Sequence, residues 1–308
     1  MIRLSFVCVL AATTTLLLVS TVRAADPISF TKFDVPGATA NDLEEAYFVP
    51  GINEDGVIVG TIGTAAGGAE GFIRTPGGAT STQIVDPNNP AHFTVLYRVN
   101  DEEVMVGWYT NDQVITHSFF LADGQFTAYD FPGAFSTYVR SLNNRGDITG
   151  NFQLSANDPG TGFITPRYGQ PITFKAPDPT TNSLAPEAVN DLRAVVGWYT
   201  TPSFPFHGFL RTPSGKFIDI VFPGTNFTRA FGINDCGVIV GRYRSADGSR
   251  HGFYGRYGHL QSLDVPGSVD TTADGINNEG RIVGQFIDSG GMPHGYVTSK
   301  VLGAGCDE

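Results

Sequence analysis

The stretch GINEDGVIVG, residues 51–60, returns twice with small changes, as GINDCGVIVG at 232–241 and as GINNEGRIVG at 275–284. In each copy a β-branched residue precedes an Asn-x-x-Gly turn, and further aliphatic residues follow it. This pattern predicts two short strands joined by a tight turn, whose glycine suits a backbone with positive φ. A hairpin that returns along one chain indicates a repeat architecture.

Weaker copies of the same hairpin occupy the rest of the chain. Aligned on the turn asparagine, six units follow one another at spacings of 43 to 47 residues. Every unit has a glycine seven residues after the asparagine, a large apolar residue two positions later, and then an aromatic residue that follows a small one. A strand that ends in a proline turn, such as FDVPG or YDFPG, separates most units. The six asparagines are Asn53, Asn100, Asn143, Asn190, Asn234 and Asn277.

The turn glycine is kept in only four of the units. Glu103 and Arg193 take its place in the second and fourth units. We expect those two turns to be slightly less stable, because a side chain at positive φ is strained. The other four units have Gly56, Gly146, Gly237 and Gly280.

Each unit offers four strands: one before the asparagine, one after the turn, one around the repeated aromatic residue, and one that ends in the proline turn. Four strands in about 45 residues is the pattern of a propeller blade, whereas a parallel β-helix has shorter coils without tight hairpins. The chain opens with a strand at 28–35 and closes after a third strand at about 294–301, so the last unit lacks its own outer strand. We therefore predict an all-β, six-bladed β-propeller of four-stranded antiparallel blades, closed by the N-terminal strand pairing in the last blade.

Residues 1–24 have the features of a cleaved export signal. Arg3 is followed by an apolar stretch, and the sequence Val22-Arg23-Ala24 fits the small-x-small rule for cleavage. A membrane anchor is the alternative, but the apolar stretch is interrupted by threonines and is shorter than the roughly 20 residues of a spanning helix. We therefore expect a secreted protein, either extracellular or periplasmic.

The remaining chain divides into a six-repeat propeller at 25–302 and a C-terminal tail at 303–308. Two cysteines, Cys236 and Cys306, lie outside the signal. An exported protein can form a disulfide between them, which would pin the tail, although two free thiols are the alternative.

The chain is acidic, with 30 Asp and Glu against 19 Lys and Arg and a formal charge of −11. Binding to nucleic acid depends on basic residues that neutralise phosphates, and the sequence has no basic cluster, so no nucleic-acid partner is expected. We also expect no membrane insertion after signal cleavage, and a soluble monomer. Phosphate loops, zinc-protease, serine-hydrolase and calcium-loop motifs are missing, so no cofactor is predicted.

A His-Gly-Phe tripeptide or a close variant follows the hairpin in four units. These tripeptides stand at 117–119, 207–209, 251–253 and 294–296. Together with the INxxGxIVG hairpin they resemble the HAF repeat of bacterial extracellular proteins, named for its His-Ala-Phe tripeptide. The resemblance covers essentially the whole chain after residue 24, although Glu70 and Thr161 stand where the repeat has histidine. It implies export and a propeller-like β fold, and it implies no common activity.

Four histidines occupy one equivalent position in the repeat: His117, His207, His251 and His294. If that position faced the central axis, four imidazoles could converge on a metal such as iron, copper or zinc. However, each histidine shares a strand face with the aromatic residue two positions later, which favours packing between blades. We predict a structural role and no metal site, with a metal at these four residues as the alternative.

A specific site is expected where the units differ, because the shared positions build the framework. The residues one, two and four positions before the turn asparagine are apolar or small with few exceptions, but those three and five positions before it vary. These two positions share one face of the strand predicted to be innermost. A channel lined by them suits a small polar ligand such as a sugar or a carboxylate, and a solvated channel is the alternative. The candidate ligand-binding residues are Tyr97, Tyr138, Arg140, Glu187, Arg229 and Asp274.

The only two tryptophans, Trp108 and Trp198, directly follow the repeated glycine in the second and fourth units. Two indoles on one rim could stack on sugar rings, and covering a blade edge is the alternative. The sequence thus predicts a secreted binding or scaffolding propeller, with a glycan or small polar molecule at its axial mouth. The alternative function is a secreted propeller enzyme, a hydrolase or lyase acting on a polysaccharide or lactone, for which no catalytic residues are identified.

Overall fold

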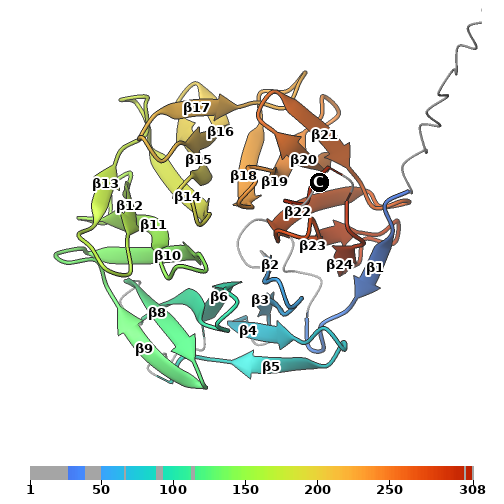
Figure 1. The fold of residues 1–308 in the computed structure, drawn as a ribbon, viewed down its shortest axis with the longest axis horizontal. Coiled ribbons are helices and arrows are strands. Elements are labelled where there is room, and N and C mark those ends of the chain that lie inside the picture. The colour runs from blue at the N-terminus through green and yellow to red at the C-terminus, as the bar shows by residue number, and fades with distance from the viewer. Residues whose placement is uncertain are drawn as a thin grey trace, which may run out of the picture.

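The computed structural model arranges six four-stranded sheets radially around a central axis (Figure 1). The predicted six-bladed β-propeller is therefore confirmed. The predicted export signal, residues 1–24, lies outside the described residues. The structure describes residues 27–38, 50–65, 67–87, 93–111, 115–301 and 303–306.

The first three blades follow one another along the chain, each with its first strand nearest the axis and its fourth outermost (Figure 1). Blade 1 contains β2 (Gly51–Ile52), β3 (Ile58–Gly63), β4 (Ala69–Arg74) and β5 (Thr80–Ile84). Blade 2 contains β6 (Thr94–Val99), β7 (Met105–Thr110), β8 (Thr116–Ala122) and β9 (Gln125–Tyr129). Blade 3 contains β10 (Ser136–Leu142), β11 (Ile148–Gln153), β12 (Thr161–Thr165) and β13 (Ile172–Phe174).

Blades 4 and 5 have the same order of antiparallel strands. Blade 4 contains β14 (Ser183–Val189), β15 (Val195–Thr201), β16 (Phe204–Arg211) and β17 (Phe217–Ile220). Blade 5 contains β18 (Thr228–Ile233), β19 (Ile239–Arg244), β20 (Arg250–Arg256) and β21 (His259–Leu263). The four strands expected in each unit are thus present, in the expected order.

The sixth blade takes its outermost strand from the other end of the chain. It contains β22 (Asp270–Ile276), β23 (Ile282–Ile287) and β24 (Pro293–Thr298), and β1 (Phe30–Phe33) pairs antiparallel with β24 (Figure 1). Phe33 lies opposite Gly295, where a Cβ would overlap its ring. The predicted closure by the N-terminal strand is therefore observed, and β24 is not left as an open sheet edge.

The repeated turn joins the first two strands of every blade. The N–H of the residue three positions after the asparagine donates to the asparagine carbonyl, for example from Gly56 to Asn53 at 3.1 Å. That residue has positive φ in all six turns, including Glu103 at 55° and Arg193 at 63°. The predicted positive φ is confirmed, and the two turns without glycine hold a side chain in a conformation that favours glycine.

Glycine at position 103 is expected to stabilise the protein. Glu103→Gly should raise the free energy of unfolding by about 0.5–1 kcal/mol, because it removes the strain of a positive φ. The same change at Arg193 should lower it, since Arg193 Nε donates to the buried carboxylate of Asp147 at 2.7 Å. Urea-induced unfolding of both variants measures the two signs. A destabilised Glu103→Gly variant would show that the turn is not strained.

The turn asparagines also connect the blades to one another. Each Oδ1 accepts the N–H of the residue four positions later, as in Asn53 and Val57 at 2.8 Å. Each Nδ2 donates to the backbone carbonyl of the turn asparagine in the next blade, and Asn277 donates back to Asn53. These six hydrogen bonds, 2.9 to 3.4 Å long, form a closed circle that we call the asparagine ring. The ring gives a physical reason for the asparagine in every unit, because its short amide satisfies its own turn and reaches the next one.

The core of each blade is built around the repeated aromatic residue of its third strand. The glycine seven residues after the asparagine lies directly across from this ring, as Gly150 does from Phe163. The aromatic residues are fully buried: Phe72, Phe119, Phe163, Phe209, Phe253 and Tyr296.

No helix within the described ranges is long and apolar enough to cross a membrane.

The described part of the C-terminal tail, residues 303–306, packs on the propeller. A disulfide joins Cys306 to Cys236 in the turn of blade 5. Of the two alternatives left open by the sequence, the bonded pair is the one observed. Ala304 is fully buried, and the N–H of Cys306 donates to the carbonyl of Asn278 at 2.8 Å. The tail is thus pinned to the face that carries the turns, which we call the turn face.

Candidate functional site

A β-bulge interrupts the innermost strand of blades 2 to 6, three residues before the turn asparagine. Pairing with the second strand skips one residue there, and a bulge redirects the skipped side chain. Three of the skipped side chains, Tyr97, Arg140 and Glu187, come from three different blades and contact one another. The bulges therefore turn the variable residues toward the axis. The skipped residues are Tyr97, Arg140, Glu187, Phe231 and Asp274.

Glu187 is the centre of a buried polar network. Its carboxylate accepts hydrogen bonds from Tyr97 Oη at 2.7 Å and from Trp198 Nε1 at 2.8 Å, and Arg140 lies 3.6 Å away. Arg140 also donates to Tyr97 Oη at 3.2 Å. Burial opposes the charge of Arg140, but the facing Glu187 carboxylate raises the pKa of Arg140 above its usual value. The charge of Arg140 is thus stabilised within the network.

Arg98 crosses the axis from blade 2 to blades 5 and 6. Its guanidinium donates to the carbonyls of Phe231 at 2.8 Å and Asp274 at 3.0 Å, while its second nitrogen donates to Tyr97 O at 2.9 Å. Gly51 makes room for it, since a Cβ there would lie 2.8 Å from Arg98 Cδ. At this depth the axis is filled by side chains, so the predicted lining residues surround a packed centre. Arg98 was not included in the site predicted from the sequence, because the position two before the asparagine was assigned to the framework. The other five units have a small residue at this position, so the arginine of blade 2 was a signal of a special role.

Asp274 lies beside Arg98 in the same packed centre. Its carboxylate accepts a hydrogen bond from Thr272 Oγ1 at 2.8 Å. Burial raises the pKa of Asp274 to about 7, although Thr272 and the charges of Arg98 and Arg242 act in the opposite direction. At neutral pH the carboxyl is therefore about half protonated.

The stability of the protein should depend on pH through Asp274. An unfolded aspartate titrates near pH 4, so the folded chain with its pKa of about 7 holds this proton more tightly. The corresponding stabilisation is fully present below about pH 4 and is lost as the pH rises through 7. In Asp274→Asn the decrease of unfolding free energy between pH 4 and 8 should be smaller by up to about 4 kcal/mol. Denaturant unfolding at pH 4, 6 and 8 tests this, and parallel curves for wild type and variant would contradict it.

The residues five positions before the asparagine lie nearer the end of the axis opposite the turn face. In blades 2 to 6, each of these residues pairs across the sheet with the residue that follows the repeated glycine. These two positions, five before the asparagine and one after the glycine, therefore lie side by side on the two innermost strands. We call the group of residues at this end of the axis the aromatic mouth, because two indoles and several other rings belong to it or pack against it. Its residues are Trp108, Tyr138, Asn151, Trp198, Arg229, Arg242, Thr272 and Gln285.

Trp108 and Trp198 have different surroundings at this mouth. Trp108 is 9% exposed and packs against Phe93 and Tyr138, with ring centroids 5.9 and 5.6 Å apart. Its Nε1 has no hydrogen-bond partner among the described residues. Trp198 is partly exposed, and the guanidinium of Arg229 lies 4.7 Å from its ring centroid. One indole thus presents a buried donor, and the other forms part of a cation–π pair.

Arg229 is held by aromatic rings rather than exposed to solvent. Its guanidinium carbon lies 3.5 Å from the ring centroid of Phe206 and 5.6 Å from that of Phe227. Arg242 faces it directly across the strand pair. The structure therefore brings together all six predicted site residues around one axis. Tyr97, Glu187, Arg229 and Asp274 are buried, whereas Tyr138 and Arg140 are partly exposed.

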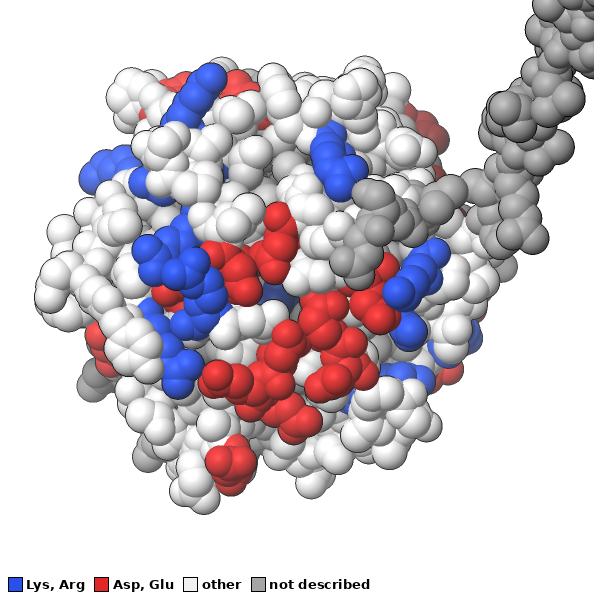
Figure 2. Space-filling model, viewed as in Figure 1, with Lys and Arg blue, Asp and Glu red and all other residues white. Residues whose placement is uncertain are grey.

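The opening on the turn face is a shallow bowl with an empty volume of about 410 Å³, including space open to solvent. Its rim consists of the residues that follow the turn asparagines, and Figure 2 shows acidic side chains gathered around the centre of this face. Each rim side chain accepts the backbone N–H of the equivalent residue in the neighbouring blade at 2.7–2.9 Å. The rim oxygens therefore hold the blades together. The rim residues are Glu54, Asp101, Asn144, Asp191, Asp235 and Asn278.

The four repeated histidines lie on the third strands of four different blades and do not converge on the axis. Each ring packs against an aromatic residue of the second strand, with centroids 4.6 to 5.4 Å apart. Among the described residues, no group of three or more His, Cys, Asp or Glu side chains is arranged to hold a metal ion. This placement keeps His117, His207, His251 and His294 apart, in four different blades.

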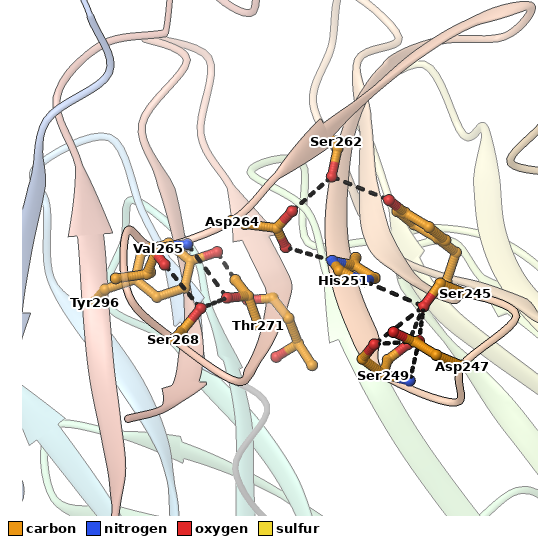
Figure 3. Close-up of polar contacts among 12 residues, drawn as sticks. Ser245, Asp247, Ser249, His251, Ser262, Asp264, Val265, Ser268, Thr271 and Tyr296 are labelled. Atoms are coloured by element: carbon orange, nitrogen blue, oxygen red, sulfur yellow. Dashed lines mark hydrogen bonds and ion pairs between the residues drawn. The ribbon is translucent and has the colours of Figure 1, made fainter. Parts of the chain in front are cut away.

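Three of these histidines join the outer strands of their blades. His251 contacts Asp264 Oδ1 at 3.1 Å through Nδ1 and Ser245 Oγ at 3.3 Å through Nε2 (Figure 3). His117 makes the same contact with Asp130 at 2.9 Å, and His294 with Asp34 at 2.6 Å. Because Asp34 follows β1, the last of these pairs ties the N-terminal strand to blade 6. These contacts lie within single blades, whereas the sequence pattern predicted that the histidines pack between blades.

No protein-family model matches the chain, and no curated protein sequence matches it. Among solved structures, the Trypanosoma rangeli sialidase has a TM-score of 0.54 and 9% identity over 89% of this chain, which spans 60% of that protein. An Aleuria aurantia lectin in complex with Fucα1-6GlcNAc has a TM-score of 0.54 and 9% identity, covering 83% of this chain and 92% of the lectin. AofleA from Arthrobotrys oligospora has a TM-score of 0.52 and 11% identity, covering 89% and 84%. At such low identity these likenesses show the fold alone.

Proposed function

We propose that this protein is an exported, monomeric glycan-binding propeller of the HAF-repeat type, which holds a sugar or small polar ligand at the aromatic mouth without a cofactor. The observation that carries the proposal is the position of Trp108 and Trp198. They are the only tryptophans of the chain, and both belong to the aromatic mouth. Flat aromatic faces stack on the apolar faces of sugar rings, so the partly exposed indole of Trp198, with the buried indole of Trp108 at the same end of the axis, favours such a ligand.

The polar groups of the mouth support the same proposal. Arg140 is partly exposed and lies between the rings of Tyr97 and Tyr138, 5.7 and 5.6 Å from their centroids. A guanidinium held in this way presents donors of fixed direction, which match hydroxyl or carboxylate oxygens. The Aleuria lectin, solved with a fucosylated disaccharide, is an example of glycan binding on the same fold.

Binding is a better account of this site than hydrolysis. A hydrolase at the axis would use Glu187 and Tyr97 as its reactive pair, since their oxygens are 2.7 Å apart. However, Tyr97 is only 3% exposed, and burial followed by the Glu187 charge raises its pKa well above the usual value. A phenol that resists ionisation and is closed off from solvent is a poor nucleophile. The pair therefore supports the mouth and does not react.

A glycan array tests the proposal with matched variants. Wild type should bind a defined set of glycans. Arg140→Gln and Trp198→Phe should each weaken binding to that set at least tenfold. Arg145→Gln is the control, because Arg145 is exposed on the turn face and bonds the carbonyl of Asp191. Thermal unfolding of all four proteins shows that they are folded. Binding by wild type that Arg140→Gln and Trp198→Phe leave unchanged would overturn the proposal.

A further inference from the structure

A cavity with an empty volume of about 710 Å³, including space open to solvent, lies between blades 2 and 3 on the side of the turn face. Its walls are largely apolar, with Val104, Phe120, Leu142 and Ile148 among them. The ion pair between Glu102 and Arg167, 3.4 Å apart and exposed, belongs to its rim. The asparagine ring contributes Asn100 to the lining. We call this cavity the blade 2–3 groove.

The equivalent groove between blades 5 and 6 is occupied by the chain's own C-terminal segment. The repeat relates Val104, Phe120, Leu142 and Ile148 to the corresponding residues of blades 5 and 6. Those residues form one buried cluster with Val301 and Ala304, both of which are at most 1% exposed. The corresponding residues are Val238, Tyr254, Ile276 and Ile282.

The polar contacts of the segment follow the repeat as well. Val301 N donates to the carbonyl of Gly280 at 3.1 Å, and Gly280 corresponds to Gly146 of the blade 2–3 groove. Asn234 Nδ2 donates both to Asn277 O at 3.2 Å and to Ala304 O at 2.8 Å. The segment is therefore held like a bound peptide, with two small apolar side chains inserted and its backbone hydrogen-bonded to the turns.

Asn100 holds the position of Asn234 in the blade 2–3 groove. It is 3% exposed, and its Nδ2 donates to Asn143 O at 3.4 Å, the longest bond of the asparagine ring. Its second amide hydrogen has no acceptor among the described residues, although a buried donor normally has one. In the next groove the corresponding amide, on Asn143, donates to the side chain of Asp147 at 3.3 Å. Asn53, Asn190 and Asn277 also donate through Nδ2 to one acceptor each, so a peptide carbonyl is assigned to Asn100 from its equivalence to Asn234, which donates to Ala304 O.

We propose that the blade 2–3 groove binds an extended segment of another polypeptide, with two small aliphatic side chains three residues apart and a carbonyl that accepts from Asn100. The chain's own tail is not available for this, because the disulfide holds it at blade 5. Glu102 stands where blade 5 has Cys236, so the partner is bound without a covalent bond. This site is separate from the aromatic mouth and does not depend on the proposed glycan ligand.

Site-directed cross-linking tests the groove with a known probe. The probe is an N-acetylated synthetic peptide of residues 300–306, KVLGAGC, and the protein variant is Glu102→Cys, which restores the cysteine of blade 5. In a glutathione redox buffer the peptide should form a mixed disulfide with Glu102→Cys at least ten times faster than with Arg145→Cys. Arg145 stands at the same turn position in blade 3. In the groove between blades 3 and 4, the ion-paired Asp147 and Arg193 stand where the blade 2–3 groove has Val104 and Gly146. Peptide mapping assigns the bond.

A second variant blocks the cavity without touching the cysteine. Val104→Phe, added to Glu102→Cys, should fill the groove and abolish the rate advantage while the protein stays folded. Val104→Leu replaces it if the phenylalanine variant does not fold. Equal rates for Glu102→Cys and Arg145→Cys, or a rate advantage that survives the filled groove, would overturn the proposal. Glycan binding should be the same in all of these proteins, so the two sites are tested independently.

Discussion

Replacing Gly150 by alanine is expected to lower the free energy of unfolding by about 3 kcal/mol or more, a large effect for one methyl group. A Cβ at this position would overlap the carbonyl oxygen of Tyr138 and lie 3.0 Å from the Cα of Val139. Both atoms are backbone beside the bulge of β10, so they cannot move without displacing Arg140 at the axis. Denaturant-induced unfolding measures the loss.

Gly77→Ala is the matched control for this prediction. The nearest atom to a Cβ at Gly77 is Thr75 Oγ1 at 3.9 Å, so its change should stay within about 0.5 kcal/mol. Equal losses in the two variants would contradict the steric account of the repeated glycine. The same overlap with the carbonyl of the innermost strand recurs at Gly107, Gly197, Gly241 and Gly284.

Removing the N-terminal strand is expected to abolish cooperative folding of the ring. A chain that starts at residue 36 lacks Phe33 and Val35, which are buried in one cluster with Phe72. Loss of the Phe33 ring alone costs about 3–5 kcal/mol. In addition, β24 becomes an open edge that can pair with other molecules. Circular dichroism on heating and size-exclusion chromatography should show a broad transition and aggregated protein.

The control for the truncation is a chain that starts at residue 27 and keeps β1. It should unfold in one sharp transition, with the same midpoint temperature as a chain that starts at residue 25. If the chain that starts at residue 36 were equally stable, the ring would not depend on the N-terminal strand.

The framework could be predicted from the sequence because each repeated residue has a local physical reason. The positive φ after Asn53 favours glycine, and the overlap at Gly150 excludes any Cβ. The positive φ recurs in all six blades and the overlap with the carbonyl of the innermost strand in blades 2 to 6, so both appear in the sequence as a period. The same period showed that the last unit lacks a fourth strand. The N-terminal segment has the matching sequence, so it was predicted to supply that strand.

The site was predicted only in part, because it depends on contacts between blades that differ from one another. The face shared by Tyr138 and Arg140 followed from strand alternation, but the bulge that turns Arg140 toward Glu187 did not. Arg98 reaches across the axis to carbonyls of blades 5 and 6, and no local pattern records a partner more than 130 residues away. Likewise, the sequence indicates that Cys306 can pair with Cys236, but not that Ala304 fills a groove.

Tryptophan fluorescence is the most direct test of the central claim, that the aromatic mouth is the binding site. Trp108 and Trp198 are the only indoles of the chain, so all tryptophan emission comes from the aromatic mouth. Titration with a glycan that binds on the array should change the emission of the wild type with a saturating curve, and Trp198→Phe should reduce both the change and the affinity. A glycan that binds by calorimetry yet leaves the emission of the wild type unaltered would place the site elsewhere and contradict the account.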